Sequence, residues 1–240
     1  MSNKYEYSSG AVDITYDAFF AAPLLDLPRI SLDVLKRFHE IISPRYTVPL
    51  SGLQSTGGNS LADVRLRVEL FDGKGIFELT PQKLAVNFAN IISSEDIEII
   101  KDCLTLALDA VKSSIPDADI SGEIIRSNCV LQISDGEFVA SGHFDKFFHL
   151  RGIFNPELYG ATDVRNGLRT QFANSEELWE MFFDVSPNSS VNSSINFSLM
   201  ATYERGSKYS SVYEKSRHME TVTDAYLGQI GLIAKRDVNS

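Results

Sequence analysis

Cysteine is scarce in this sequence, which contains only Cys103 and Cys129. Two cysteines are too few for a disulfide framework, and these two do not have CxxC spacing. Each stands among apolar residues, in "KDCLTLAL" and in "SNCVLQI", a setting typical of a buried free thiol. We therefore expect neither a structural disulfide nor a cysteine-based metal site.

Long apolar runs are also missing. No stretch approaches the roughly eighteen uninterrupted apolar residues needed to span a bilayer. The opening residues "MSNKYEYSSGAVD" lack the basic and apolar regions of a secretory signal. We therefore expect a cytoplasmic protein without a membrane partner, and its 43% hydrophobic residues are enough for a buried core.

Basic residues are outnumbered by acidic ones. The chain has 22 Lys and Arg against 32 Asp and Glu, which gives a formal net charge of -10. Binding to a phosphate backbone requires a broad basic face, so nucleic acid is not an expected partner. It would become one only if the arginines at 65, 67, 165 and 169 gathered on one face.

Catalytic signatures are absent as well. The sequence has no GxSxG elbow, no GxGxxG fingerprint, no HExxH motif and no kinase-like motif. Because catalytic groups can meet in space without a local motif, this absence lowers the expectation of an enzyme without excluding one. We expect no cofactor and assign no catalytic residue.

Strand and helix periodicities are clear in the first half of the chain. They predict a strand at 9–20, a helix at 31–43, a hairpin at 63–79 that continues through 80–90, a helix at 94–113 and a strand at 122–134. In the hairpin, Asp72 and Gly73 stand where the turn requires positive φ. The helix at 94–113 carries two adjacent apolar stripes, which predicts that it is covered on two sides.

The second half repeats this order. Its periodicities predict a strand at 137–154, a short helix at 174–183, a hairpin at 194–216 and a closing helix at 221–235. The sequence therefore predicts an α+β fold with a duplicated strand-helix-hairpin-helix unit, mainly antiparallel sheets and helices packed on one face. The halves, 1–134 and 135–240, are expected to form one compact domain with a shared core. Whether their two sheets join or pack face to face stays open.

One run, "SGHFDKFFHLRG" at 141–152, concentrates polar residues among phenylalanines. In a strand, His143 and His149 would share a face but lie roughly 20 Å apart, at about 3.3 Å per residue. They are therefore too far apart to form a local zinc site, and no metal ligand is assigned. Half-exposed strand residues are the favoured interpretation. If this region binds a ligand or partner, the candidate residues are His143, Asp145, His149, Arg151 and Trp179.

The run "FELTPQKLAVNFAN" follows the charged hairpin and precedes the long helix. It resembles a pattern in an uncharacterised family of bacterial proteins of similar length, in which a strand carries Ser/Thr-Pro-x-Lys/Arg-Leu before a second strand and a helix. The resemblance covers about residues 63–112. It implies an α+β fold and a bacterial setting, and it carries no functional residue over to this chain.

These observations favour a non-enzymatic protein-binding or assembly scaffold that associates with itself through a sheet face or edge. The reason is surplus apolar surface, in the two stripes of helix 94–113 and in the runs "DAFFAAPLL" and "KFFHL". The alternative is a small-ligand-binding or hydrolytic protein with a site between the halves. The residues expected around that site are Phe144, Phe148, Trp179 and Phe183, with polar groups from His143, Asp145 and His149.

Overall fold

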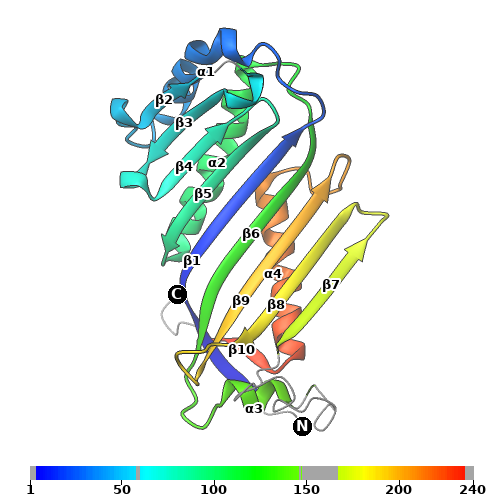
Figure 1. Cartoon of the computed structure of the whole chain (residues 1–240). Coiled ribbons are helices and arrows are strands. Elements are labelled where there is room, and N and C mark those ends of the chain that lie inside the picture. Colours follow the sequence, from blue (N-terminus) through cyan, green and yellow to red (C-terminus); the bar gives the residue numbers. More distant parts are fainter. Residues whose placement is uncertain (1–3, 58–59, 146, 148–166, 236–240) are drawn as a thin grey trace.

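The computed structural model describes residues 4–57, 60–145, 147 and 167–235 (Figure 1). The strands are β1 (Tyr5–Phe20), β2 (Leu53–Thr56), β3 (Arg65–Leu70), β4 (Gly75–Leu79), β5 (Lys83–Ile91), β6 (Ile120–Ile133), β7 (Leu168–Asn174), β8 (Trp179–Pro187), β9 (Ser194–Glu204) and β10 (Leu232–Ala234). The α-helices are α1 (Leu27–Ile42), α2 (Ser94–Ser114), α3 (Ala140–Asp145) and α4 (Val212–Gln229), and three short 3₁₀ helices lie at Leu50–Gly52, Leu61–Asp63 and Phe71–Gly73. The fold is therefore mixed α+β, as predicted.

All ten described strands belong to one sheet. Its order is β2-β3-β4-β5-β1-β6-β9-β8-β7, with β10 paired beside the first residues of β1. Neighbouring strands are antiparallel except for β10, which runs parallel to β1. Strand β1 lies at the centre, where Tyr16 pairs with Val86 of β5 and with Ile125 of β6. Of the two arrangements left open by the sequence, the described strands form a joined sheet.

One face of this sheet forms the hydrophobic core. Along β3, Leu66, Val68 and Leu70 are buried while the arginines and the glutamate between them are not. The same alternation continues on β4, β8 and β9. In Figure 1, α2 and α4 lie behind the sheet. The other face, called the open face below, consists of the alternate side chains of the same strands.

Helix α2 occupies the range predicted for it. It begins with a capping box, in which the Ser93 side chain accepts from the Asp96 N–H and the Asp96 carboxylate accepts from the Ser93 N–H. One buried side consists of Ile100, Cys103, Leu104, Ala107, Ala110 and Val111. Helix α2 contacts both β5 and α1. The prediction that this helix is covered on two sides is confirmed, so much of its apolar surplus is used within the molecule.

The buried setting predicted for the cysteines is confirmed for Cys103, which is fully buried, while Cys129 is half-buried. Burial raises the pKa of the Cys103 thiol to about 12 and that of Cys129 to about 11. Both thiols therefore remain protonated and unreactive at neutral pH.

The predicted hairpin at 63–79 is also confirmed, as β3 and β4. Its turn holds Phe71, Asp72 and Gly73 at positive φ, of 53°, 55° and 84°. The helix predicted at 31–43 is present but begins earlier, at Leu27, because Pro28 stands in its first turn, where a proline costs no intrahelical hydrogen bond.

The strand predicted at 137–154 is wrong in its described part. Residues 140–145 form the short helix α3, and the His143 N–H donates to the Val139 carbonyl at 2.9 Å. Ala140, His143 and Phe144 are buried, a spacing of three and four residues that belongs to a helix face. The pattern of apolar residues in this run therefore fits a strand and also a helix, and the contacts with the rest of the protein favour the helix.

The helix predicted at 174–183 is wrong as well. Its first residues form a turn in which the Asn174 side-chain oxygen accepts from the N–H groups of Glu176 and Glu177. Leu178 then adopts a φ of 57°, and the chain continues as β8. Asn174, which was interpreted as a helix cap, therefore caps a turn, because Asn favours both helix N-termini and turns.

The predicted hairpin at 194–216 has only its first arm, β9. After the turn the chain enters α4 at Val212, nine residues before the predicted start at 221. A capping box sets this start: the Ser211 side chain accepts from the Glu214 N–H at 3.2 Å, and the Glu214 carboxylate accepts from the Ser211 N–H at 3.0 Å. The start predicted at Thr221 is therefore wrong.

The closing helix also ends earlier than predicted. Helix α4 stops at Gln229, and Gly231 follows with a φ of 83°. Residues 232–234, predicted as helix, form β10 and pair with Tyr5–Tyr7. The end of the described chain therefore returns to the strand that begins it.

Candidate functional site

His143, a predicted binding residue, is buried in an aromatic cluster. Its ring lies 5.5 Å from that of Tyr5 and 5.2 Å from that of Phe138, measured between centroids. Its Nε2 lies 2.8 Å from the carbonyl oxygen of Ile230, just beyond the end of α4. His143 therefore packs α3 against the C-terminal end of α4.

Trp179 lies far from His143. It begins β8, and its indole ring lies 4.7 Å from the ring of His218 on α4. His218 and Ile230 are separated by about 18 Å along the helix, at about 1.5 Å per residue. The structure therefore does not bring Trp179 and His143 together. The other predicted residues are Asp145, which ends α3, and His149 and Arg151, which lie outside the described residues.

The two described phenylalanines that were expected to line a cavity between the halves do not line one. Phe144 and Phe183 are fully buried in the hydrophobic core. Phe148 lies outside the described residues. The two buried rings therefore stabilise the core. The polar and charged residues that could form a site lie elsewhere.

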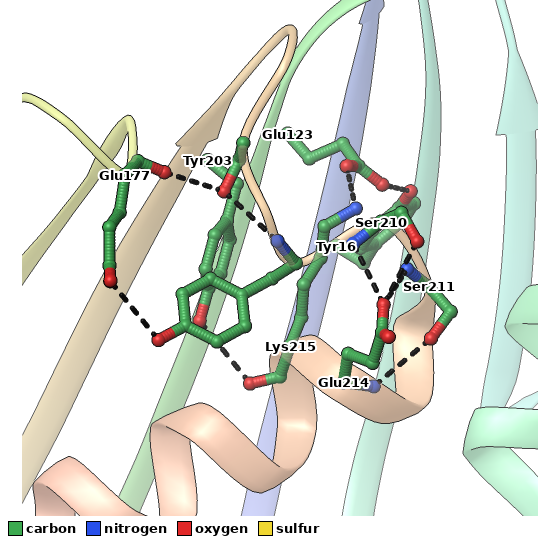
Figure 2. A network of polar contacts seen from close by, with 10 residues as sticks. Tyr16, Glu123, Glu177, Tyr203, Ser210, Ser211, Glu214 and Lys215 are labelled. Atoms are coloured by element: carbon green, nitrogen blue, oxygen red, sulfur yellow. Dashed lines mark hydrogen bonds and ion pairs between the residues drawn. The ribbon is translucent and has the colours of Figure 1, made fainter.

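A buried ion pair connects α4 to the sheet (Figure 2). The Lys215 ammonium donates to one oxygen of the Glu123 carboxylate, and the Tyr16 hydroxyl donates to the other. Lys215 is 3% exposed and Glu123 is 9% exposed. Because an unpaired charge at such depth is strongly destabilising, the three groups must act together.

The sheet register explains how these groups meet. Glu123 lies on the core face of β6, where its cross-strand partners are Ala18 of β1 and Tyr203 of β9. The Tyr203 ring lies below Lys215, whose Nζ is 5.8 Å from the ring centroid. Lys215 thus reaches the carboxylate across an aromatic surface, which shields the pair from water.

The Tyr203 hydroxyl extends this network to His218. It lies 3.2 Å from the Lys215 carbonyl oxygen and 3.1 Å from Nδ1 of His218. A carbonyl can only accept, so the single hydroxyl hydrogen goes to Lys215 and Nδ1 of His218 must donate. This hydrogen-bond arrangement assigns the proton of a neutral His218 to Nδ1 and leaves Nε2 as an acceptor.

Aromatic rings fix the orientation of His218. Its ring stacks on that of Tyr209, with 3.9 Å between centroids and 12° between planes, and Trp179 contacts it edge-on. Burial lowers the pKa of His218, and the cation of Lys208 lowers it further, while the carboxylate of Glu177 opposes them. His218 is therefore neutral at pH 7.

The Glu177 carboxylate accepts hydrogen bonds from side chains that lie close to His218 (Figure 2). Its carboxylate accepts from Trp179 Nε1 at 3.0 Å, from the Tyr209 hydroxyl at 3.3 Å and from the Lys208 ammonium. The pKa of this carboxyl is lowered, with the hydrogen bond from Lys208 as the largest cause. The cluster therefore holds a neutral, oriented histidine. Such a group suits ligand binding, and no serine or cysteine is hydrogen-bonded to it as a nucleophile within the described residues.

The open face contains a second group of charged residues, centred on Asp17 of β1. Its carboxylate accepts from Lys83 Nζ at 2.6 Å and from the Arg126 guanidinium at 2.7 Å. Burial raises the pKa of Asp17, but the hydrogen bonds from Lys83 and Arg126 lower it more, so the net direction is down. Lys83 also lies 5.7 Å from the centroid of the Phe19 ring.

Two further ion pairs lie on the open face. Arg67 forms an ion pair with Glu69 at 2.7 Å, and Arg65 forms one with Glu78 at 3.6 Å. Between and beside these pairs the face carries partly exposed apolar side chains. They are Phe19, Ile76, Ile124, Phe182 and Met200.

Sequence reasoning missed both groups of residues. Glu123 and Lys215 are 92 positions apart, and only the register of β6 and the start of α4 bring them together. One signal was available, because Ser211 and Glu214 have the S-x-x-E spacing of a capping box. That signal would have placed Lys215 and His218 on a helix.

Two searches of the described residues were negative. No helix among them combines the length and the apolar composition needed to cross a membrane. Nowhere among them do three or more His, Cys, Asp or Glu side chains gather as a metal site would require.

The sequence matches no model of a known protein family, and a search of curated proteins finds no significant relative.

Proposed function

We propose that this protein is a non-enzymatic assembly protein whose open face binds a second copy of the same chain. The observation that carries the proposal is the composition of that face, where ion pairs join charges of β1, β3, β4, β5 and β6 and apolar side chains remain partly exposed. Such a surface can be removed from water at a lower cost than one with unpaired charges.

Three of the apolar side chains, those of Ile124, Met200 and Phe182, are neighbours on β6, β9 and β8. Met200 of β9 is the cross-strand partner of Phe182 on β8 and of Arg126 on β6. Ile124, two residues before Arg126, pairs with Thr202 beside Met200. Partly exposed apolar side chains grouped in this way are typical of interaction surfaces.

The area of the open face is sufficient for a stable dimer. Nine strands at about 4.8 Å spacing span about 38 Å, and six residues along a strand span about 20 Å. The product is close to the roughly 800 Å² that each partner buries in a standard interface. A band six residues deep across the whole width of the open face therefore provides the required area.

Charge indicates which face of the molecule a second copy would meet. The molecule carries a formal charge of -10, so most surfaces of two copies repel each other. On the open face, Arg65, Arg67, Lys83 and Arg126 each pair with an acid of the same face. This face is thus where two copies meet with least repulsion.

The duplicated architecture expected from the sequence belongs to the same proposal. Outward from β1 the sheet continues with β5, β4 and β3, and outward from β6 it continues with β9, β8 and β7. This matching order supports a duplicated unit with helices on one face, although its second copy would begin at β6 and not at residue 135, where the sequence predicted it. Such a repeat would give the open face an approximate two-fold symmetry, which suits an isologous dimer.

Light scattering over a dilution series tests the proposal. We expect a dimer for the natural protein and a monomer for Met200→Glu, because the new carboxylate would lie among the apolar side chains of the interface. The matched control is Leu32→Glu, at a residue of α1 that is 74% exposed, and it should remain dimeric. A natural protein that stays monomeric, or a folded Met200→Glu variant that stays dimeric, would refute this interface.

A further inference from the structure

A hollow of about 350 Å³ opens on the outer surface of α4. It is lined by Tyr209, Tyr213, Glu214, Arg217, His218 and Thr221. Four of these residues, from Glu214 to Thr221, are spaced by three or four positions and therefore share one helix face. The two tyrosines border this face at its N-terminal end, so the hollow combines polar groups with aromatic rings.

The hollow contains a carboxylate with an unused oxygen. Oε2 of Glu214 accepts from the Ser210 N–H and hydroxyl, both at 2.9 Å, and from the Ser211 N–H at 3.0 Å. Within the described residues, Oε1 accepts no hydrogen bond. Hydrogen bonds from Ser211 and Ser210 lower the pKa of Glu214 to about 2. The group is therefore anionic at all physiological pH values, and one oxygen is free for a ligand.

The hollow also contains an unused cation. The Arg217 guanidinium forms no ion pair with any described residue, although Glu214 precedes it by three positions on the same face. Its side chain is exposed. Because a guanidinium is always charged and matches a carboxylate with two parallel donors, Arg217 is a suitable partner for a carboxylate.

His218 adds an acceptor between these charges. Its Nδ1 is occupied by Tyr203, and its Nε2 has no protein partner within the described residues. Since His218 is neutral, it does not repel a cation bound at the neighbouring Glu214. A ligand ammonium near Glu214 would therefore find two acceptors, Oε1 of Glu214 and Nε2 of His218.

We propose that this hollow binds the zwitterionic head group of an aromatic amino acid. The ammonium binds to Glu214 and His218, the carboxylate binds to Arg217, and the aromatic side chain packs on Tyr213, which is 46% exposed. The opposite charges of the site, separated on one helix face, match the opposite charges of the head group. The inference is independent of self-association, because α4 lies on the side of the sheet away from the open face (Figure 1).

Four probes separate the contributions of the head group and the ring. L-Phenylalanine carries both charges and a ring, 3-phenylpropionate lacks the ammonium, phenethylamine lacks the carboxylate, and L-alanine lacks the ring. Each is titrated into ¹⁵N-labelled protein while amide shifts are recorded. We expect saturable shifts at residues 209–221 with L-phenylalanine, and binding weaker by about tenfold or more for each of the other three, which corresponds to one lost charge-assisted or aromatic contact.

Variants of the two charged residues test the site itself. Arg217→Gln and Glu214→Gln should each weaken L-phenylalanine binding by about tenfold, and Gln at 214 retains the capping hydrogen bond. Arg29→Gln is the matched control, because the Arg29 side chain on α1 is 79% exposed, and this variant should bind as the natural protein does. Circular dichroism establishes that each variant is folded.

Three results would overturn the proposal. The first is the absence of saturable shifts with L-phenylalanine. The second is equal binding of phenethylamine or 3-phenylpropionate, which would show that the charge missing from that probe is not recognised. The third is undiminished binding by a folded Arg217→Gln variant. Since the titration monitors residues 209–221, its failure is distinguishable from a failure of the dimer proposal, which concerns mass.

Discussion

Asp17 shows how a single residue can be buried on a sheet face that no described helix covers. It is 8% exposed because Lys83 and Arg126 lie over its carboxylate from the two neighbouring strands. Its hydrogen bonds lower the pKa of Asp17 below the ordinary value of 3.8. The folded protein therefore holds Asp17 ionised at pH values where the unfolded chain begins to bind a proton.

This difference predicts a pH-dependent contribution to stability. A group with a lowered pKa in the folded state contributes fully above the unfolded pKa, and the contribution is lost as pH falls through the folded pKa. Relative to Asp17→Asn, the natural protein should be more stable by about 1–3 kcal/mol at pH 6, and the gap should narrow below about pH 4.

Urea unfolding of both proteins between pH 6 and pH 2.5 measures the gap. Asp184→Asn is the matched control, because Asp184 is exposed on the same face and forms no ion pair with a described residue. A gap for Asp17→Asn that stays constant over the whole range would contradict the prediction.

At the scale of elements, the structure shows which sequence patterns were decisive and which were ambiguous. The helix at 94–113 and the hairpin at 63–79 were predictable because caps, periodicity and turn residues agreed, and α2, β3 and β4 follow them. The runs at 140–145 and 179–183 were mispredicted because their local patterns fit both helix and strand. There the choice depends on neighbours distant in sequence, such as β9 for β8.

The candidate site was even less accessible to sequence analysis. Glu123 lies within a strand that was predicted correctly, but a single acid on the core face gives no pattern by itself. Its partner Lys215 lies in a segment predicted as a hairpin arm, and its other neighbour, Tyr203, lies across the sheet. A site formed by three elements requires the register of the sheet, which the sequence alone does not provide.

The ion pair predicts how α4 is attached to the sheet. Lys215→Met removes the cation and leaves the Glu123 carboxylate buried without its partner, so the free energy of unfolding should fall by about 3–5 kcal/mol. The double variant Glu123→Gln with Lys215→Met removes both charges and should recover most of the loss. Lys36→Met is the control, because the Lys36 side chain is 75% exposed.

Urea denaturation followed by circular dichroism measures these differences. If Lys215→Met alone proves nearly neutral, the pair is not an anchor of α4. If the double variant is no more stable than the single one, the loss comes from packing of the lysine side chain, and the buried charge is not its cause.

At the scale of the whole molecule, the two halves share the hydrogen bonds of one sheet. Strand β1 pairs with β5 on one side and with β6 on the other, and it also receives β10 from the end of the described chain. The core residues of both halves form one cluster. A boundary between 134 and 135 therefore does not interrupt the sheet, because β6 ends at Ile133 and joins β1 to β9.

This continuity predicts that the halves unfold together. Trp179, the only tryptophan of the chain, reports on β8 in the second half. Leu84 is fully buried on β5 in the first half. Replacing Leu84 by Ala should destabilise the protein by about 2–5 kcal/mol, and tryptophan fluorescence should register this loss in full, because a cooperative unit has one transition for all probes.

The measurement compares urea midpoints from Trp179 fluorescence with those from far-ultraviolet circular dichroism, for the natural protein and for Leu84→Ala. Coincident curves that shift together are the expected result, since separating the halves would expose the backbone of β1 and β6 to water. In Leu84→Ala, the fluorescence midpoint could stay at the value of the natural protein while circular dichroism shows an additional transition at lower urea concentration. The first half would then unfold alone. The continuous sheet would then not make the two halves one cooperative unfolding unit.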